Sequence, residues 1–400
     1  MKKTLFLTYD YPPCSAPGAG MRSQKLARYL PEFGWDVMVM CREEGIFEGA
    51  EKQAVAEVIR IRTPIPPRVS YQIGAWMWAR RILSRAGAVI RESGLDLIYA
   101  SCPPFPHGLT AVRLAREAGI PGVVDFRDAW SLDPHLSGGA LKQAAKRALC
   151  RWVYPGMERR LIESADAIIM NTPSMHREYV GILEGFEHRV HVVPNGFDEA
   201  DFCRCGEVSR RELPLLLYCG RLTGIGGRSP EILLRAMRAV IDSGRRVELD
   251  IVGDDSAMLR RSIQRWGLEG SVRARAAVPH REAIRAMREA DVLVVYQAPS
   301  RNGVTPVAGK TYEYLRSGRP ILAIVPAGDN ADLVRRYAGV HAVVSSADSD
   351  DVAAAILDLL DREVCTTNLA PNAEFVEKYT RRRIAEQVAG IFDAVVDGRA

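Results

Sequence analysis

Short apolar segments alternate with amphipathic segments along almost the whole chain. In the first half, the apolar segments have the length and composition of buried β-strands. They are Thr4–Thr8, Asp36–Met40, Leu95–Ala100, Gly122–Asp125, Ala167–Met170 and Val190–Val193. Most are separated by segments with helical spacing of apolar residues, such as Gln24–Phe33 and Leu109–Ala118. Strand–helix alternation is typical of a parallel sheet with helices on both faces, so the pattern predicts an α/β fold.

The second half repeats this scheme without repeating the sequence. Its predicted strands are Leu215–Cys219, Val247–Val252, Val272–Ala276, Asp291–Tyr296, Ile321–Val325 and Ala342–Val344. Helical spacing separates them, as in Pro230–Asp242 and His280–Glu289. Pro194-Asn195-Gly196 interrupts the alternation, and we place an interdomain linker near Asn195–Asp201. We therefore predict a first domain over residues 1–195, a second over 196–373 and a terminal helical segment over 374–400.

The composition is that of an ordinary globular protein. The chain has 400 residues, 47% of them hydrophobic and 26% charged, which is enough for two or three domains with substantial cores. No stretch reaches the roughly 18 consecutive apolar residues of a membrane span. The apolar run after Met1 is short and ends at Asp10, so we interpret it as a first strand, not a signal peptide, and expect a cytoplasmic protein. The net charge of +5 comes without a nucleic-acid recognition module.

The eight cysteines do not have the spacing of a metal site. Cys203 and Cys205 are the only close pair, and the nearby His191 does not complete a zinc site. We expect reduced, mostly buried thiols and no structural metal.

A glycine-rich turn flanked by two arginines is the most informative segment. Residues 218–236 read YCGRLTGIGGRSPEILLRA, an apolar strand end, a turn and an amphipathic helix. Arg221 and Arg228 flank the turn where a helix N-terminus offers free N–H groups to an anion. Two guanidinium groups at one loop suit a diphosphate. The alternative is a plain strand–helix turn with two solvated arginines.

A second segment, residues 309–322 (GKTYEYLRSGRPIL), carries Lys310, Thr311 and Glu313. Together with Gly220-Arg221-Leu222, Arg228 and Ser317-Gly318-Arg319-Pro320, it resembles the donor site of the retaining family 4 glycosyltransferases. The resemblance also covers residues 8–40, the motif VVPNGFD and the last helix, and thus nearly the whole chain. It implies two facing Rossmann-like domains (the GT-B architecture), with a C-terminal helix that crosses back to the N-terminal domain.

The resemblance implies a function as well. The second domain would bind a nucleotide diphosphate-sugar, and the first would bind an acceptor whose hydroxyl receives the sugar with retention, without a metal or other cofactor. Arg221 and Arg228 would stabilise the diphosphate, and Glu313 would either bind the ribose or only cap its helix. The other donor-binding candidates are Gly18, Gly20, Asp254, Pro279, His280, Lys310 and Thr311. We expect a role in cell-surface polysaccharide or glycolipid biosynthesis.

The chain departs from the family pattern at two positions. Thr305 stands where relatives usually have a first glutamate, and Arg127 stands where some have a histidine. These departures keep open the alternative of a catalytically silent nucleotide-sugar-binding module. A second alternative is an epimerase or phosphorylase on the same architecture, because a fold does not determine the function. Gly18-Ala19-Gly20 lacks the complete G-x-G-x-x-G pattern because residue 23 is Ser. This loop either approaches the donor phosphate or is a plain turn.

The first domain supplies the acceptor candidates. Arg127, Asp128 and Trp130 follow a predicted strand, and ligands of open α/β sheets bind at the carboxyl ends of strands. We assign Arg127 and Asp128 catalytic roles and Trp130 acceptor binding; the alternative is a buried ion pair. His107 is either acceptor-binding or a packing residue.

Residues 141–160 form a basic amphipathic pattern, with Lys142, Lys146 and Arg147 on neighbouring turns. Residues 62–81 of the same domain add aromatic and basic residues. Such a helix either lies on an anionic membrane, at the inner face of the cell membrane, or is a solvated face packed through its apolar side. The first interpretation suits a lipid-linked acceptor.

Overall fold

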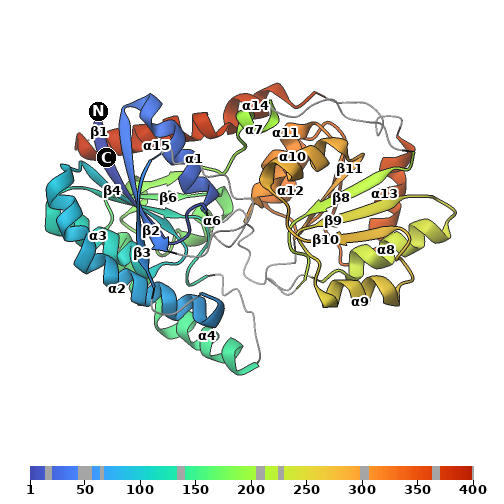
Figure 1. Ribbon diagram of the computed structural model, residues 1–400, viewed down its shortest axis with the longest axis horizontal. Coiled ribbons are helices and arrows are strands. Elements are labelled where there is room, and N and C mark those ends of the chain that lie inside the picture. The colour runs from blue at the N-terminus through green and yellow to red at the C-terminus, as the bar shows by residue number, and fades with distance from the viewer. Residues whose placement is uncertain are drawn as a thin grey trace. The chain divides into compact units, whose positions relative to one another are not determined.

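The computed structural model describes residues 1–13, 20–43, 56–63, 67–132, 140–203, 212–223, 229–297, 306–362 and 370–398. The chain divides into two compact units (Figure 1). The first comprises Met1–Pro134, Ala144–Asn195 and Arg381–Ala400, and the main segment of the second is Gly196–Thr380. The chain returns to the first unit after Thr380, a few residues beyond the boundary expected at residue 373.

The first unit contains a fully parallel sheet of seven strands. In spatial order they are β3 (Glu57–Arg62), β2 (Trp35–Glu43), β1 (Lys2–Thr8), β4 (Leu97–Cys102), β5 (Gly122–Phe126), β6 (Ala167–Met170) and β7 (Val190–Val192). The direction of winding reverses between β1 and β4. The sequence did not predict β3, because this edge strand alternates apolar and charged residues and has no continuous apolar run.

Helices cover both faces of this sheet. They are α1 (Met21–Tyr29), α2 (Pro67–Ser93), α3 (Pro106–Ala118), α4 (Ala140–Trp152), α5 (Tyr154–Ser164), α6 (Pro173–Tyr179) and α15 (Arg381–Val396), with short 3-10 turns at Leu30–Phe33 and Glu187–Arg189. Alternate residues of β1 serve opposite faces: Phe6 packs in the cluster with α1 and α15, and Leu5 and Leu7 pack in the cluster with α2 and α3. A strand buried on both faces needs apolar residues throughout, which is why β1 was visible in the sequence.

Helix α15 is an integral part of the first unit. Ile384, Val388 and Phe392 are fully buried against the sheet and α1. At its outer end, Asp393 accepts hydrogen bonds from Lys2 Nζ (2.9 Å) and Trp35 Nε1 (3.2 Å). The expected return of the last helix to the first domain is therefore confirmed.

The second unit has a parallel six-stranded sheet. Its order is β10 (Val272–Arg275), β9 (Glu248–Val252), β8 (Leu215–Cys219), β11 (Val292–Tyr296), β12 (Ile321–Ile324) and β13 (His341–Val344). The winding reverses between β8 and β11. The surrounding helices are α7 (Glu199–Phe202), α8 (Glu231–Asp242), α9 (Ala257–Arg265), α10 (His280–Glu289), α11 (Gly309–Ser317), α12 (Asp329–Tyr337), α13 (Ser349–Asp361) and α14 (Ala373–Tyr379).

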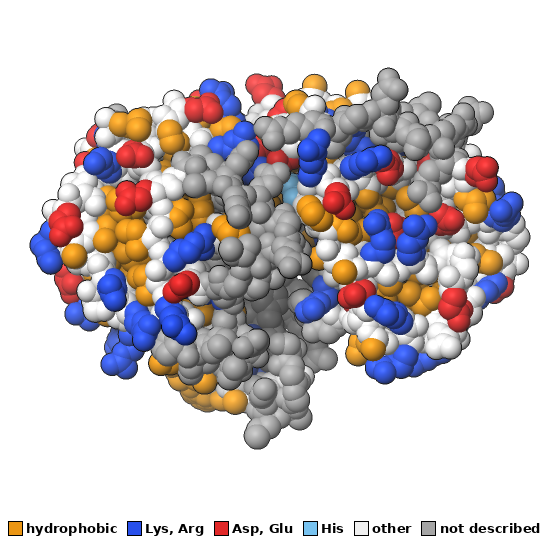
Figure 2. Space-filling view, in the orientation of Figure 1, with side chains coloured by type: hydrophobic (Ala, Val, Ile, Leu, Met, Phe, Trp, Pro, Cys, Tyr) orange, Lys and Arg blue, Asp and Glu red, His pale blue; other side chains and the backbone are white. Residues whose placement is uncertain are grey.

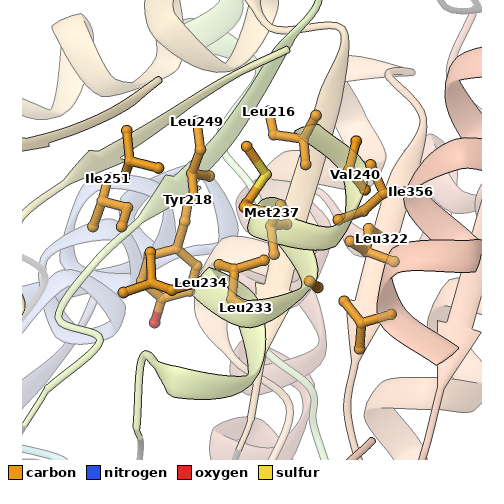
Figure 3. Close-up of a cluster of buried hydrophobic side chains, with 14 of the residues drawn as sticks. Leu216, Tyr218, Leu233, Leu234, Met237, Val240, Leu249, Ile251, Leu322 and Ile356 are labelled. Carbon is orange, nitrogen blue, oxygen red and sulfur yellow. The ribbon is translucent and has the colours of Figure 1, made fainter. Parts of the chain in front are cut away.

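The core of the second unit lies on both sides of its sheet. On one side, α8 presents Leu233, Leu234, Met237 and Val240 at helical spacing toward the strands, as Figure 3 shows. On the other side, α10, α11, α12 and α14 pack with β8, β11 and β12 in a second cluster. The predicted α/β class with two parallel-sheet domains is confirmed.

The chain connections at Asn195–Gly196 and Thr380–Arg381 lie beside each other. Phe197, just after the first connection, forms a parallel bridge with Thr380, just before the second, and donates its N–H to the Tyr379 carbonyl oxygen at 3.1 Å. In the first unit, Asn195 Oδ1 accepts hydrogen bonds from Arg22 Nη1 (3.4 Å) and Arg381 Nη1 (3.3 Å).

Within the described ranges, no helix has the length and apolar character needed to span a membrane, and no group of His, Cys, Asp and Glu side chains could hold a metal ion. Cys41, Cys102, Cys150 and Cys219 are buried free thiols, and Cys203 is an exposed one.

Candidate active site

The reversal of winding between β8 and β11 marks the strongest candidate for a ligand site in the second unit. In open α/β sheets, ligands bind outside the carboxyl ends of the strands where the winding reverses. Here β8 ends at Cys219 and β11 ends at Tyr296. The two segments singled out in the sequence, residues 218–236 and 309–322, follow these two strands.

Two glycine turns pack against each other at the end of β8. Gly220 has φ +126° and donates its N–H to the Val252 carbonyl oxygen at 2.7 Å. Gly253 has φ +108°, and a Cβ atom there would lie 3.2 Å from Gly220 Cα. A Cβ atom on Gly220 would lie 2.8 Å from Lys310 Nζ. Both positions therefore require glycine, for backbone conformation and for space.

Asp254 organises the turn after β8. Its Oδ2 accepts hydrogen bonds from Leu222 N–H (3.0 Å), Thr223 N–H (2.8 Å) and Thr223 Oγ1 (2.7 Å), and its Oδ1 accepts one from Ser256 N–H (3.1 Å). Burial alone would raise the pKa of Asp254, but the hydrogen bonds from Thr223 and Ser256 outweigh it and lower the pKa. The carboxylate is buried and occupied by this turn, so it would support a donor site by shaping the turn.

Replacing Asp254 with asparagine should lower the free energy of unfolding by about 2 kcal/mol at pH 7, because the amide cannot accept all these hydrogen bonds. A lowered pKa in the folded state stabilises the protein above the pKa of the unfolded state. This contribution is lost as the pH falls below about 4. Urea unfolding at pH 7, 5 and 3.5 should show the difference between wild type and Asp254→Asn shrinking at the lowest pH. The exposed neighbour Asp255 supplies the control, Asp255→Asn; a constant difference at all three pH values would contradict the prediction.

Lys310 places a positive charge next to the turn at Gly220. Its Nζ lies 3.8 Å from the ring centroid of Tyr218, whose hydroxyl donates to the Arg221 carbonyl oxygen at 3.1 Å. Lys310 is in the first turn of α11, where no side chain caps the helix and no acid is present. A cation at a helix N-terminus is unfavourable by itself. The lysine and the uncapped N–H groups would together stabilise an anion at this place.

The neighbouring candidates differ in how far they are available to a ligand. The Arg221 side chain is exposed beside the turn. Thr311 is fully buried, and its Oγ1 donates to Asn330 Oδ1 at 2.9 Å, so it strengthens the start of α11 from inside. Arg228, like Thr305, lies outside the described residues.

His280 and Glu313, which the sequence singled out separately, are in contact. His280 Nε2 lies 2.8 Å from Glu313 Oε1, and its Nδ1 lies 3.7 Å from Asp201 Oδ2. Pro279 immediately precedes α10, and His280 is the first residue of that helix. Asp201 was missed because nothing in its local sequence shows that α7 lies against α10.

In the first unit, the reversal of winding lies between the ends of β1 and β4. Gly20 precedes α1 with φ +75°, and a Cβ atom there would collide with the Asp10 carbonyl oxygen. No side chain caps α1, and no acid is present in its first turn. Gly18 lies outside the described residues.

Arg127 is held rigidly at the end of β5. Its Nη2 donates to the Pro103 carbonyl oxygen at 2.7 Å and its Nε to that of Cys102 at 3.3 Å. Within the described part of the chain it forms no ion pair with a carboxylate, although the half-buried Asp128 is its neighbour in sequence. The Arg127 guanidinium is thus bound by backbone carbonyl oxygens, and the described residues do not show the alternative of a buried Arg127–Asp128 ion pair.

The two acceptor-binding candidates are both buried. The Trp130 ring stacks on Phe105 at a centroid distance of 4.7 Å and an interplanar angle of 3° and is 7% exposed. His107 is fully buried, with Nε2 3.0 Å from the Ser101 carbonyl oxygen. Burial lowers the pKa of His107 to about 3, so this ring is neutral at physiological pH. Both side chains contribute to packing around the site, and their contact with an acceptor stays a prediction.

Sequence reasoning missed two buried ion pairs at the carboxyl edge of the first sheet. Arg42 donates to Asp10 Oδ1 from Nε (2.9 Å) and Nη2 (2.6 Å). Arg22 Nε donates to Asp125 Oδ2 at 2.6 Å. Arg22 also donates to the Val193 and Pro194 carbonyl oxygens and thereby holds the chain where it leaves the first unit. The only sign of these ion pairs in the sequence was that Asp10 and Asp125 each stand at the end of an apolar run.

Two family models match the chain in succession. A glycosyl transferase 4-like domain matches residues 17–196, and the glycosyl transferases group 1 model matches residues 213–362. The chain is 24% identical over 311 residues to the D-inositol 3-phosphate glycosyltransferase of Corynebacterium jeikeium. That alignment covers 72% of this chain and 59% of the relative, so the chain spans about three fifths of the relative's length.

Solved structures match over nearly the whole chain. Sucrose-phosphate synthase from Thermosynechococcus elongatus matches with a TM-score of 0.73 at 16% identity and covers 100% of both chains. Anabaena HepE in complex with UDP-glucose matches with a TM-score of 0.66 at 18% identity and covers 98% of this chain and 100% of that chain. At these identities the likeness shows the fold, which is the GT-B fold of two Rossmann-like domains.

Proposed function

Since the chain belongs to the group 1 glycosyltransferases of the GT-B fold, we propose that it is a retaining enzyme acting on a nucleotide diphosphate-sugar. It transfers the sugar to a hydroxyl of an acceptor bound by the first unit. The observation that carries this proposal is the anion site at the end of β8. There, the Gly220 turn, the exposed Arg221 and Lys310 at the uncapped start of α11 lie where the winding of the sheet reverses.

The proposed chemistry uses these groups as follows. The bond between the anomeric carbon and the diphosphate oxygen breaks, and its electron pair stays on the diphosphate. The acceptor oxygen bonds to the anomeric carbon on the same face, and its proton passes to the departing diphosphate. Arg221, Arg228 and Lys310 stabilise the negative charge that develops as the diphosphate leaves. Arg127 and Asp128 orient the acceptor from the first unit.

A panel of UDP- and GDP-sugars, scored by thermal shift and by nucleotide release with sugar, polyol and lipid-linked acceptors, tests this function. Turnover to a glycosylated product of unchanged anomeric configuration supports it. Stabilisation without turnover on any acceptor would instead indicate a binding module. Conversion of the donor sugar without an acceptor would indicate an epimerase.

The proposed reaction needs no divalent metal, because cationic side chains match the diphosphate. We expect kcat and the donor KM to change less than twofold in EDTA. Adding magnesium or manganese after EDTA treatment is the control for chelator side effects. Activity that is lost in EDTA and restored by either metal would contradict metal independence.

We further propose that the first unit docks on an anionic membrane to reach a lipid-linked acceptor in polysaccharide or glycolipid synthesis. The C-terminal part of α4 exposes Leu149 (39%) and Trp152 (75%), and the next residue, Val153, is also exposed (44%). The Arg151 guanidinium lies over the Trp152 ring at 5.2 Å. Figure 2 shows Lys and Arg side chains beside hydrophobic ones in the region where Figure 1 places α2 and α4. Exposed aromatic and basic residues side by side suit the interface of an anionic bilayer.

The membrane proposal predicts salt-sensitive flotation with liposomes that contain anionic lipid. Each basic residue at the surface contributes about 1 kcal/mol, so Lys146→Glu with Arg147→Glu should weaken binding at least tenfold at low salt. The matched control, Arg260→Glu with Arg261→Glu on α9 of the second unit, should change little. If the wild type does not float at low salt, or if both double variants behave alike, α4 is a solvated helix.

A further inference from the structure

We infer that His280 is a positioning residue that holds the Glu313 carboxylate in place for the ribose of the donor. This inference rests on the proposed function, in which Glu313 binds the ribose hydroxyl groups. It concerns three side chains from three helices: Asp201 of α7, His280 of α10 and Glu313 of α11.

The contact between His280 and Glu313 has the geometry of a hydrogen bond. The 2.8 Å from Nε2 to Oε1 lies within the ordinary range for an N–H donor and a carboxylate oxygen. The side chains of His280 and Glu313 are 33% and 20% exposed, so water competes with this bond only in part. Nδ1 lies 3.7 Å from Asp201 Oδ2, which is beyond a hydrogen bond; the carboxylate attracts this side of the ring when Nδ1 carries a proton.

Helix α7, which carries Asp201, is held to α11 by further contacts. Arg316 of α11 donates from Nε to Glu199 Oε2 at 2.7 Å and from Nη2 to Glu199 Oε1. Its guanidinium also lies over the Phe202 ring at 5.0 Å. Both partners are in α7, the helix of Asp201. Each of the three helices thus contacts the other two. Arg316 of α11 binds Glu199 of α7, Asp201 of α7 lies near His280 of α10, and His280 contacts Glu313 of α11.

The position of Glu313 explains why it needs to be held. It lies three residues after Lys310 on α11 and therefore on the same side of the helix, about 4.5 Å further along the axis. A donor whose diphosphate lies at Lys310 would place its ribose close to Glu313. A glutamate side chain with free rotamers would lose that freedom on binding, which costs about 0.5–1.5 kcal/mol. A carboxylate already fixed by His280 avoids most of this loss.

Four single variants test the inference through the donor KM, kcat and the Kd of UDP or GDP, whichever binds the wild type. His280→Ala should raise KM and Kd about tenfold with kcat within twofold of wild type, because the loss is in donor binding. His280→Gln should restore most of the affinity, since its amide nitrogen can reach the place of Nε2. His280→Asn, whose nitrogen is nearer the place of Nδ1, should behave like alanine. His341→Gln is the control, because that ring lies at the start of β13 with Nδ1 3.0 Å from the Ala338 carbonyl oxygen.

The outcomes separate this inference from the function on which it rests. Glu313→Gln is measured in parallel. If it weakens donor binding while His280→Ala does not, the positioning role is wrong and the proposed function stands. If neither variant weakens donor binding, the ribose role of Glu313 is wrong and the inference fails with it. If His280→Ala unfolds, the comparison of glutamine with asparagine decides: equal affinity of the two would overturn the inference.

Discussion

Replacing Arg221 with alanine is expected to lower kcat by roughly a hundred- to a thousandfold. Removing one preorganised donor that stabilises charge in a transition state typically costs about 2.7–4 kcal/mol. Arg221 follows Gly220 directly, its side chain is exposed, and its carbonyl oxygen is fixed by the Tyr218 hydroxyl. If the Arg221 guanidinium binds the diphosphate more strongly as negative charge develops there, its removal lowers kcat as well as donor affinity. Steady-state kinetics with the accepted donor, and circular dichroism for folding, measure the effect.

The companion variants sharpen this test. Arg228→Lys should be milder, because a point charge keeps much of the attraction to a diphosphate. A double variant that changes both Arg221 and Arg228 should lose less transition-state stabilisation than the sum of the two single losses, since both groups act on one charge. Arg238→Ala removes a guanidinium that pairs with Asp242 on α8 and should leave kcat unchanged. Normal turnover of a folded Arg221→Ala protein would mean that the diphosphate binds elsewhere.

Replacing Phe392 with alanine is expected to lower the free energy of unfolding of the first unit by about 3–5 kcal/mol. Phe392 is fully buried, and its ring lies 5.2 Å from Trp35 and 5.7 Å from Tyr99 between ring centroids. The truncation leaves a cavity between α15 and the sheet that the surrounding rings cannot fill. Urea unfolding followed by tryptophan fluorescence should show the loss, because five of the six tryptophans belong to the first unit.

Phe392→Leu should cost less than alanine, because it leaves a smaller cavity. The second unit should unfold as in the wild type, and Trp266, its single tryptophan, can be followed in a variant that lacks the other five. An unfolding curve of Phe392→Ala that matches the wild type would mean that α15 does not complete the core of the first unit.

The sequence predicted the sheets well because both are parallel and buried on both faces. A strand such as β8 needs five consecutive apolar residues, Leu215–Cys219, and all five are buried. Such a run stands out from the helical spacing beside it. The edge strand β3 has only one buried residue, Ile61, so its sequence alternates and carries no comparable signal.

The residues of the candidate site could be predicted only where several of them lie within one short segment of the sequence. The Gly220 turn and the start of α11 could be recognised because glycine, arginine and lysine lie close together in sequence. The roles of Asp254 and Asp201 depend on contacts with residues 31 and 79 positions away, which no local pattern encodes. His107 and Trp130 show the converse: their residue types suggested ligand binding, but burial by distant elements decided their surroundings.

The place of α15 in the first unit also sets the order in which the protein can fold during synthesis. The second unit is essentially continuous from Gly196 to Thr380, whereas the first needs Ile384, Val388 and Phe392 to close its core. A ribosome adds about 5–20 residues per second, so the intervening segment takes roughly 10–40 s to emerge. Throughout that interval the apolar face that α15 will cover stays open, although its strands were made first. The half of the protein that is translated first is therefore the half that is completed last.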